Sequence, residues 1–538
     1  MDGQKNHLVG KGYTGLSRRQ LLPSLVLGLG LTVASLGGFG IHEAFAAGEE
    51  YGGTLNLRTS GNPSNFDPLA NGSGNVLAII GPAYNGIMQY DPLDQSKLIG
   101  DLAESWELSS DGLTYTFNLV QNAKFHDGVP MTSADVKYTF DVMRDPPDGQ
   151  ASRRKSLLQV IDRIEAPDDH TVRFVLKRPG PGFLETLSGG WMLVLPKHIL
   201  EKGPMTDVII GTGPFMFKEQ KAGVSYELVK NPDYFVEGRP FLDGVTAFVV
   251  PDRGTTMSAL QNGQLGLYVS MTAGEAADMS GSDAVTSLTT NSTSFSGVTF
   301  NIERPPFDNI LVRKALALAI DRGDALALIK GAGVLGGAVM PSRWALSDAE
   351  MAEIPGYGPD GSANLEEAKR LLAEAGFPDG FAVTVTVRRI NRFVAEGIFL
   401  QDQWSKIGID VTLDNQESAM YHATTGERNF DVAVSGGSYA SADPDNVGPY
   451  YACGGSKNLS QYCDPETDAL IERVSGELDT EERVRLARQL DRRVMEQYAI
   501  YPLYWRNRFM GVNNTFHGMV LHSNNDNNLK MQDVWISK

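Results

Sequence analysis

Apolar and polar residues alternate along several short segments of the first 250 residues. Between Leu113 and Leu119 every second side chain is apolar and the intervening ones are polar. Because successive side chains of a strand point to opposite faces, this period predicts a half-buried β-strand. Trp106 and Leu108 alternate in the same way before a Ser-Asp-Gly turn. The two segments are therefore predicted to pair as an antiparallel hairpin.

A helix start follows this hairpin. Thr132 and Asp135 have the spacing of a capping box, and Val136, Phe140 and Met143 after them fall on one helical face. Alternation predicts further strands within residues 51–57, 172–176, 226–229 and 245–250. Residues 273–296 are rich in Ser, Thr, Gly and Ala, and their pattern assigns no element.

The pattern changes after Phe300. Apolar residues recur at helical spacing from Leu311 to Ile320, and a second helix is predicted to begin at Asn364 and to stop near Gly376. Strand, helix and strand then follow at 383–387, 399–406 and 409–413, an order typical of a parallel βαβ unit. Residues 300–499 are therefore predicted to be α/β. Trp404 is predicted to pack in the core of its helix.

The amino terminus has the pattern of an export signal. Arg18 and Arg19 precede an apolar stretch from Leu21 to Ile41, which is followed by Ala-Phe-Ala at 44–46. This order predicts a cleaved signal over residues 1–46, with paired arginines typical of the twin-arginine pathway. A retained transmembrane anchor is the alternative, since the stretch is long enough to span a bilayer. No Cys follows the cleavage region, so we expect no lipid anchor.

Composition excludes some partners. The 538 residues include 47 basic and 65 acidic side chains, a net charge of −18. Nucleic acid and anionic membranes would repel such a chain at long range. A chain of this length with 42% apolar residues is long enough for two or more cores.

Cys453 and Cys463 are the only cysteines. A disulfide between them would suit an oxidising compartment, while a metal pair and two free thiols are the alternatives. No His lies between them, and two thiolates alone do not complete a tetrahedral metal site.

Signatures of catalysis are missing from the sequence. It contains no Gly-x-Ser-x-Gly elbow, no His-Glu-x-x-His pair and no Walker-type loop. His517 and His522 are expected to be surface residues. Carboxylates are too numerous in so acidic a chain for any pair to be singled out.

Five fragments in fixed order resemble a known family. They are Ala103–Trp106, the Ser-Ser-Asp-Gly turn at 109–112, Tyr115–Phe117, Lys124–Gly128 and Thr132–Val136. Together they resemble the periplasmic oligopeptide-, dipeptide- and nickel-binding proteins that serve ABC importers (solute-binding family 5, which also includes opine-binding proteins). The fragments themselves form a hairpin and a helix, and we expect none of them to touch ligand.

The resemblance implies a fold. It is an α/β, two-lobed periplasmic-binding-protein fold of type II, in the large three-domain cluster, with a hinge and a ligand cleft between the lobes. After the signal at 1–46, the implied segments are domain I at 47–90, 205–299 and 500–538, domain II as part of lobe 1 at 91–204, and lobe 2 or domain III at 300–499.

A first candidate binding position follows the predicted strand at 383–387, where Arg388, Arg389 and Arg392 stand. Ligands of open α/β sheets bind beyond the carboxyl ends of the strands, so position and charge agree. If the alignment is allowed a small gap, Arg388 also resembles the arginine that holds the peptide carboxylate in dipeptide-binding relatives. Solvated loop cations are the alternative interpretation of all three.

A second candidate position is the loop 436–446, which resembles the cleft-lining Asp-Pro loop of the family and offers Ser438, Tyr439, Asp443 and Asn446. Peptide-binding members usually carry an acidic residue three positions before the Asp-Pro pair, where it grips the ligand's α-amine. Ala440 stands there instead. An unpaired amine in a closed cleft would lose a charge-assisted hydrogen bond, so an ordinary dipeptide is not the expected ligand.

Two more features come from the resemblance. In the family the opening strand leads to the ligand cleft, which makes Asn62 a further candidate. Several dipeptide-binding relatives also carry a Cys pair at a similar place before a Leu-Ile helix, here 469–471, and this supports the disulfide interpretation of Cys453 and Cys463.

The implied function is that of a periplasmic receptor without catalysis and without a cofactor or metal. It would capture a peptide-like, opine-like or other carboxylate-bearing or neutral small solute by lobe closure. We expect a monomer that delivers the solute to an ABC permease in the inner membrane and does not bind nucleic acid. A hydrolytic enzyme on the same scaffold, or a receptor for chemosensing or chaperone-like binding, are the alternatives.

Overall fold

One large mixed sheet organises the computed structural model, which describes residues 50–94, 97–357, 364–523 and 529–537. Its strands follow the spatial order β15-β14-β16-β12-β17-β11-β1-β10-β9-β8, and β13 pairs with β17 beside this path. The strands are β1 Thr54–Thr59, β8 Phe215–Lys221, β9 Ser225–Lys230, β10 Gly244–Val249, β11 Leu267–Met271, β12 Val285–Phe300, β13 Gly333–Val334, β14 Ala382–Arg388, β15 Asp410–Gln416, β16 Val432–Ser438 and β17 Ile500–Asn513.

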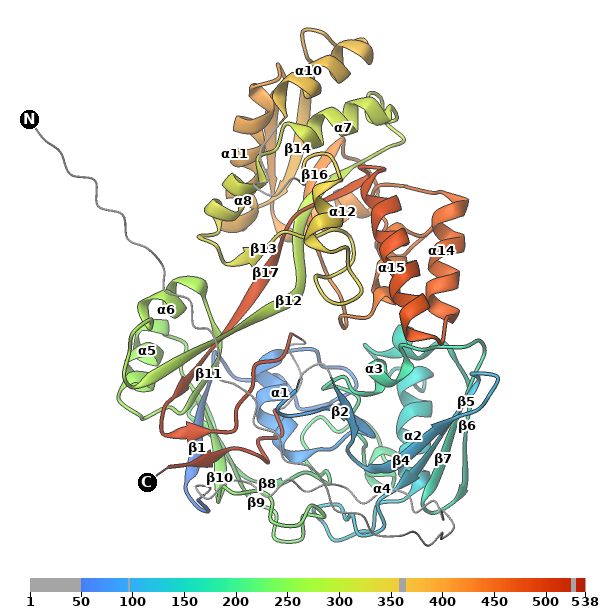
Figure 1. Cartoon of the computed structure of the whole chain (residues 1–538). Coiled ribbons are helices and arrows are strands. Elements are labelled where there is room, and N and C mark those ends of the chain that lie inside the picture. Colours follow the sequence, from blue (N-terminus) through green and yellow to red (C-terminus); the bar gives the residue numbers. More distant parts are fainter. Residues whose placement is uncertain (1–49, 95–96, 358–363, 524–528, 538) are drawn as a thin grey trace, which may run out of the picture. The chain divides into compact units, whose positions relative to one another are not determined.

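The two long strands β12 and β17 lie side by side through the middle of this sheet (Figure 1). They pair antiparallel from Val285 opposite Asn513 to Thr299 opposite Ile500, and the register shifts between Asn291 and Phe295. On one side of the pair β12 contacts β16, and on the other β17 contacts β11. The segment whose pattern assigned no element, 273–296, thus forms helix α6 (Ala273–Asp278) and most of β12.

A separate four-stranded sheet has the order β4-β5-β7-β6, and a small sheet pairs β2 with β3. These strands are β2 Met88–Tyr90, β3 Leu98–Gly100, β4 Ala103–Leu108, β5 Thr114–Leu119, β6 Ile161–Asp168 and β7 Thr171–Leu176. The antiparallel pairing of β4 with β5 confirms the predicted hairpin. The short pair β18 (Phe516–His517) and β19 (Trp535–Ile536) completes the described strands.

Helices cover these sheets. They are α1 Gly74–Ile80, α2 Ser133–Arg144, α3 Phe183–Leu187, α4 Lys197–Leu200, α5 Arg253–Gln261, α7 Ile310–Leu318, α8 Arg322–Leu328, α9 Asp348–Ala352, α10 Leu365–Glu374, α11 Asn391–Ser405, α12 Ser418–Gly426, α13 Gly448–Tyr451, α14 Pro465–Gly476 and α15 Thr480–Met495. Helix α2 begins with the predicted capping box, in which Thr132 and Asp135 bond each other's backbone. In the part of the chain that the structure describes, no helix is both long and apolar enough to cross a membrane.

Two large apolar clusters make up most of the core. One gathers buried residues from 55–247 with a few from β11, β17 and the carboxyl-terminal segment, and the other gathers residues from 295–505. Strands β14 and β15 pair in parallel around α11, as the βαβ pattern predicted. Trp404 is fully buried in the second cluster, where its indole N–H donates to the Leu316 carbonyl oxygen at 2.9 Å.

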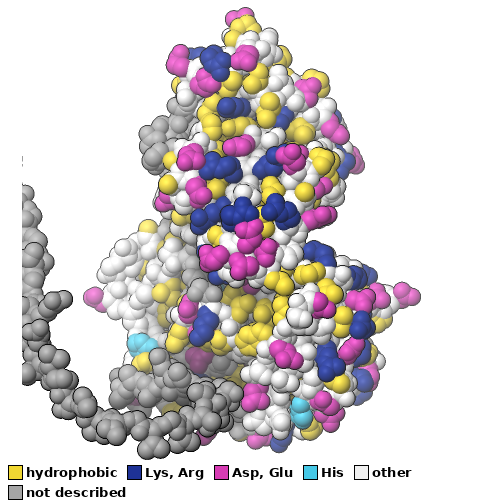
Figure 2. Space-filling model, turned by 45° about the vertical axis from the view of Figure 1, so that its right-hand side comes forward, with side chains coloured by type: hydrophobic (Ala, Val, Ile, Leu, Met, Phe, Trp, Pro, Cys, Tyr) yellow, Lys and Arg dark blue, Asp and Glu magenta, His cyan; other side chains and the backbone are white. Residues whose placement is uncertain are grey.

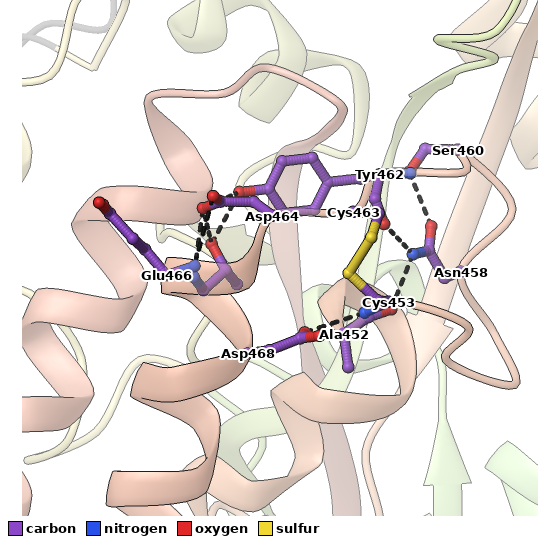
Figure 3. Close-up of a disulfide and its surroundings, with 10 residues drawn as sticks. Ala452, Cys453, Asn458, Ser460, Tyr462, Cys463, Asp464, Glu466 and Asp468 are labelled. Carbon is purple, nitrogen blue, oxygen red and sulfur yellow. Dashed lines mark hydrogen bonds between the residues drawn. A yellow bond between two sulfur atoms is a disulfide. The ribbon is translucent and has the colours of Figure 1, made fainter.

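The structure joins Cys453 and Cys463 in a disulfide (Figure 3). Polar side chains fix the chain on both sides of the bond. The Cys453 N–H donates to the Asp468 carboxylate at 2.9 Å, and Asn458 donates to the carbonyls of Ala452 and Tyr462. The bond thus closes a loop that is already held to the start of α14.

The exposure of β4 differs from that of a half-buried strand. Trp106 and Leu108 are each 37% exposed, whereas Tyr115 and Phe117 on β5 are buried. The order of the sheet explains the difference, because β4 is an edge strand whereas β5 lies between two neighbours. Alternation predicted the strand, but the buried face depends on packing that a local pattern does not contain.

Replacing Trp404 with Ala is expected to lower the free energy of unfolding by about 3–5 kcal/mol, because a fully buried indole and its hydrogen bond are lost. Urea denaturation followed by circular dichroism measures the change. Trp106→Ala, at an exposed edge position, is the control and should cost less than about 1 kcal/mol. Equal losses in the two variants would contradict the core role of Trp404.

Candidate functional site

A cleft of about 610 Å³ lies between two segments that are far apart in sequence. One wall comes from residues 154–192 and the other from residues 440–449, which follow β16. We call these the 154–192 wall and the 440–449 wall. The residues lining the cleft are Arg154, Ser156, Leu157, Gln159, Val160, Lys177, Arg178, Gly180, Gly182, Phe183, Glu185, Thr186, Gly189, Gly190, Trp191, Met192, Ala440, Ser441, Asp443, Asp445, Asn446 and Pro449.

A buried ion pair fixes the 440–449 wall. Both oxygens of the Asp443 carboxylate accept from the Arg483 guanidinium, at 2.7 and 2.8 Å, and both side chains are 4% exposed. Arg483 also contacts Asp445 at 3.2 Å. Because Arg483 binds both oxygens of Asp443, the charge of this carboxylate is already compensated within the protein.

Asn446 holds the same loop in shape. Its side-chain oxygen accepts from the Ala440 N–H at 2.9 Å, and its amide donates to the carbonyl oxygens of Ser441 and Asp443. The backbone around Ala440 is therefore positioned by Asn446, while the Ala440 side chain offers the cleft only a methyl group. No carboxylate at position 440 is available to pair with an amine.

Glu185, on α3, is the acidic group of the opposite wall. Burial, together with the negative charge of Asp443, raises the pKa of Glu185 to about 7, and the charge of Arg483 opposes this rise. One oxygen of the Glu185 carboxylate is buried without a hydrogen-bond partner. The walls come close here, because a Cβ built on Gly182 would lie 2.9 Å from the Asp443 carboxylate.

Basic and aromatic groups complete the 154–192 wall. The guanidinium of Arg154 lies over the ring of Trp191, 4.3 Å from its centre. Lys177 and Arg178 line the cleft beside them. Trp191 and Arg154 are both buried, so the exposed Lys177 and Arg178 supply the positive charge that this wall presents, which suits anionic ligand groups.

The structure brings only part of the predicted site together. Asp443 and Asn446 line the cleft. Ser438 is exposed at the end of β16, where its hydroxyl contacts that of Ser294 at 3.1 Å. Tyr439 is 5% exposed and donates its hydroxyl to the Ala338 carbonyl, so its ring packs in the core and is not among the residues lining the cleft. Asn62 is exposed and accepts from the Tyr226 hydroxyl.

The predicted arginines lie at the carboxyl end of β14. Arg388 is half-buried, 3.2 Å from the His422 ring nitrogen and 4.7 Å from the centre of the Phe393 ring. Arg389 is exposed and forms a surface ion pair with Glu417 at 2.9 Å. Strands β14 and β16 are parallel, so Arg388 and the loop that carries Asp443 leave the same edge of the sheet.

Sequence reasoning missed the whole 154–192 wall and Arg483. No local pattern distinguished Arg154, Glu185 or Trp191 from surface residues, and their role depends on tertiary contacts across some 250 residues of sequence. The charge of Asp443 gave a partial indication of Arg483, since a carboxylate that becomes buried requires a positively charged partner.

Metal ligation and histidine chemistry find no support here. Among the described residues no group of three or more His, Cys, Asp or Glu side chains could hold a metal ion. His522 is 3% exposed, which corrects the expectation of a surface residue, and burial lowers its pKa to about 4. His517 stacks on Trp535 and contacts the Ser537 hydroxyl.

Several proteins of known type are similar to this chain. It is 29% identical over 472 residues to heme-binding protein A of Haemophilus influenzae, with 80% of this chain and 84% of the relative covered. It is 33% identical over 395 residues to putative ABC transporter peptide-binding proteins of Brucella species, with 71% of each chain covered. The solved structure of AgaA with agropinic acid, from A. tumefaciens R10, matches at 29% identity and a TM-score of 0.72, covering 90% of this chain and 99% of that one.

The structure of HbpA2 from Haemophilus parasuis, at 24% identity and a TM-score of 0.79, covers 90% of this chain and 100% of its own and supports the fold. The α/β architecture described above is thus the two-lobed periplasmic-binding-protein fold. The model of the bacterial extracellular solute-binding proteins, family 5, matches residues 97–458. This chain therefore belongs to family 5 of the bacterial extracellular solute-binding proteins and is a substrate-binding protein.

Proposed function

We propose that this protein is the exported receptor of an ABC importer and that it captures a carboxylate-bearing or neutral small solute in the cleft between the two walls. The relatives named above bind heme, peptides or agropinic acid, which supports small-solute capture. A volume of about 610 Å³ falls in the range of about 300–1,000 Å³ usual for small-molecule sites. The receptor performs no reaction and presents its solute to a membrane permease.

One observation supports this ligand class most directly. The 440–449 wall carries Ala440 where an amine-binding acid would stand, and its buried carboxylate, Asp443, is neutralised by Arg483. A free α-amine beside Ala440 would lose its hydration without gaining the acid that grips it in peptide-binding relatives, and the nearest unpaired carboxyl, Glu185, belongs to the opposite wall. A ligand without a free amine pays no such penalty, whereas a ligand carboxylate can be met by the basic groups.

Closure is proposed to occur at β12 and β17. The register of this pair shifts between Asn291 and Phe295, where three residues of β12 (292–294) lie opposite one residue of β17 (Arg506). A bulged strand pair bends more readily than a regular one. We also propose that Arg388, which leaves the same sheet edge as the 440–449 wall, binds the carboxylate end of the solute. Asn446 lines the cleft, whereas Ser438 and Asn62 are proposed to approach the solute on closure. The proposed twin-arginine signal at 1–46, which would deliver the monomeric receptor to the periplasm, lies outside the described residues.

Identification of the bound solute tests the proposal. Native mass spectrometry of the purified protein, followed by extraction and thermal shift against a metabolite panel, should find one small molecule bound per chain and released unchanged. Conversion of that molecule by the pure protein would contradict the receptor function.

Arg388→Ala is expected to weaken binding of that solute by about 2–5 kcal/mol, because a charge partner of a carboxylate is removed from a desolvated position. Isothermal titration calorimetry measures the loss. Arg389→Ala is the matched control, since Arg389 forms an exposed ion pair worth at most about 1 kcal/mol. Equal affinities of wild type and Arg388→Ala would reject the assignment of Arg388.

Ala440→Asp is expected to create affinity for a ligand amine, because it supplies the acid that the 440–449 wall lacks. Titration of the wild type and the variant with one unmodified dipeptide, such as Ala-Phe, measures the gain, expected to be about tenfold or more. Ala440→Asn, of the same size but neutral, should gain little. A dipeptide that binds the wild type as tightly as Ala440→Asp would disprove the amine argument.

Solute binding is expected to strengthen as the pH falls from about 8 to about 6. In this structure burial and the charge of Asp443 raise the pKa of Glu185 from 4.5 to about 7. We propose that closure of the walls keeps this carboxyl buried, so that the closed form takes up a proton relative to a form in which Glu185 is solvated. Ser441, Arg483 and Arg343 face the same carboxyl and oppose the rise without reversing it. Calorimetry at both pH values measures the effect. Glu185→Gln should remove most of it, and an unchanged pH dependence in that variant would refute the role of Glu185.

A further inference from the structure

Three arginines and one buried acid lie near the carboxyl end of β14: Arg392 and Arg506 act on the charge of Glu396, and Arg388 shares the Phe393 ring with Arg392. Arg388 ends β14, Arg392 and Glu396 lie on α11, and Arg506 lies on β17. We call these four residues the arginine cluster. Arg388, Arg392 and Glu396 lie within eight residues of one another, and the fold of the central sheet brings Arg506, more than 100 residues later in the sequence, beside them.

Short contacts connect the members. The guanidinium groups of Arg388 and Arg392 lie 4.7 and 4.2 Å from the centre of the same Phe393 ring. A nitrogen of Arg392 lies 3.5 Å from an oxygen of Glu396. Burial and the positive charge of Arg392 lower the pKa of Arg506 to about 10, which places Arg506 within electrostatic reach of Arg392.

Only one of the two carboxylate oxygens of Glu396 has a hydrogen-bond partner. Glu396 is completely buried, and one of its oxygens accepts from the Tyr504 hydroxyl. Burial raises the pKa of Glu396. Its other oxygen is buried without a hydrogen-bond partner, and so are the Nε atoms of all three arginines. His422, beside Arg388, adds no negative charge.

The cluster therefore carries three positive charges against at most one negative charge. This excess is unusual within a chain of net charge −18. Helix α15 offers a contrast, because its arginines are matched one by one with acids. Arg485 pairs with Glu482, Arg488 with Glu350 at 3.7 Å, Arg492 with Glu353 at 2.9 Å and Arg493 with Asp464 at 2.6 Å. Figure 2, which turns the α14–α15 side forward, shows basic and acidic side chains interleaved on that surface.

Uncompensated guanidinium groups in a partly buried site raise the free energy of the protein, and an anion that meets them lowers it. A single carboxylate would neutralise only half of an excess of two charges. Planar guanidinium groups bind phosphate and carboxylate oxygens in pairs, so a group or pair of groups with two negative charges matches this site best.

Resting on the proposed receptor function, we propose that the arginine cluster is the subsite for a dianionic part of the solute, either a phosphate-type group or two neighbouring carboxylates. Its position fits a ligand subsite. Arg388 leaves the same sheet edge as the 440–449 wall, and Ser296, opposite Tyr504, lies beside the register shift of β12 and β17. An anion bound there contacts β14, α11 and β17 together.

Simple anions test this subsite without knowledge of the natural solute. Inorganic phosphate, succinate and acetate are titrated at pH about 8 and equal ionic strength, with binding followed by calorimetry and thermal shift. Phosphate or succinate should bind saturably, and acetate should bind at least about tenfold more weakly. The preferred dianion distinguishes a phosphate-type group from a dicarboxylate.

Arg392→Gln and Arg506→Gln are each expected to weaken dianion binding by about tenfold or more, since each removes a charge-assisted contact. Arg392→Lys and Arg506→Lys, which keep the charge, should retain most of the affinity. Arg389→Gln, a nearby arginine already paired with Glu417, is the matched control and should bind like the wild type. Circular dichroism checks folding. If Arg506→Gln does not fold, Arg392→Gln, whose parent side chain is 31% exposed, decides the test alone.

Absence of saturable dianion binding to the wild type, or equal losses in Arg389→Gln and Arg392→Gln, would overturn the subsite. These outcomes leave the receptor function standing as long as one solute co-purifies with the protein and is released unchanged. The proposed function fails separately, if the pure protein converts that solute.

Discussion

The pairing of β12 with β17 is the constraint on which the rest of this structure depends. These two strands carry one sheet from the apolar cluster built on β1, β10 and their neighbours to the one built on β14 and β16. Their pairing is regular except at two register shifts, between Asn291 and Phe295 and between Ser296 and Gly297. The same strands therefore link the two cores, and their register shifts are where the proposed closure would bend the sheet.

Charge balance organises the binding region around this pair. Asp443 and Arg483 hydrogen-bond each other through both carboxylate oxygens, and this buried ion pair holds the 440–449 wall in place. The arginine cluster is the opposite case, because its positive charges outnumber its negative charge. We propose that an anionic part of the solute balances this excess. A binding protein gains from this division, because the satisfied pair fixes geometry while the unsatisfied groups provide affinity.

Much of the fold could be predicted from local pattern, for reasons visible in particular residues. Tyr115 and Phe117 alternate because β5 lies between two strands and buries one face, and the Thr132 capping box marks a helix start wherever it occurs. Strand β12 escaped prediction because its Ser- and Thr-rich sequence has weak contrast between its faces. It is a strand because β16 and β17 pair with it, which is tertiary information.

Residues of the candidate site could be predicted only where they follow the carboxyl end of a strand, the position at which ligands of open α/β sheets bind. Arg388 and the loop after β16 follow strand ends, and a general rule places ligands there. Tyr439 stands in the same loop and still packs inward, because Phe295 and Trp505 surround its ring. Nothing local in the sequence separates these two outcomes. Only tertiary contacts between distant segments place Glu185 and Trp191 at the cleft and Arg506 in the arginine cluster.

The glycine at position 182 sets how tightly the two walls can meet. Its missing side chain leaves room for the Asp443 carboxylate, which would otherwise lie only 2.9 Å from a methyl carbon. Even the smallest side chain there would force the Asp443 carboxylate or the backbone at Gly182 to shift. In the proposed receptor, close approach of the two walls thus relies on the absence of a single carbon atom.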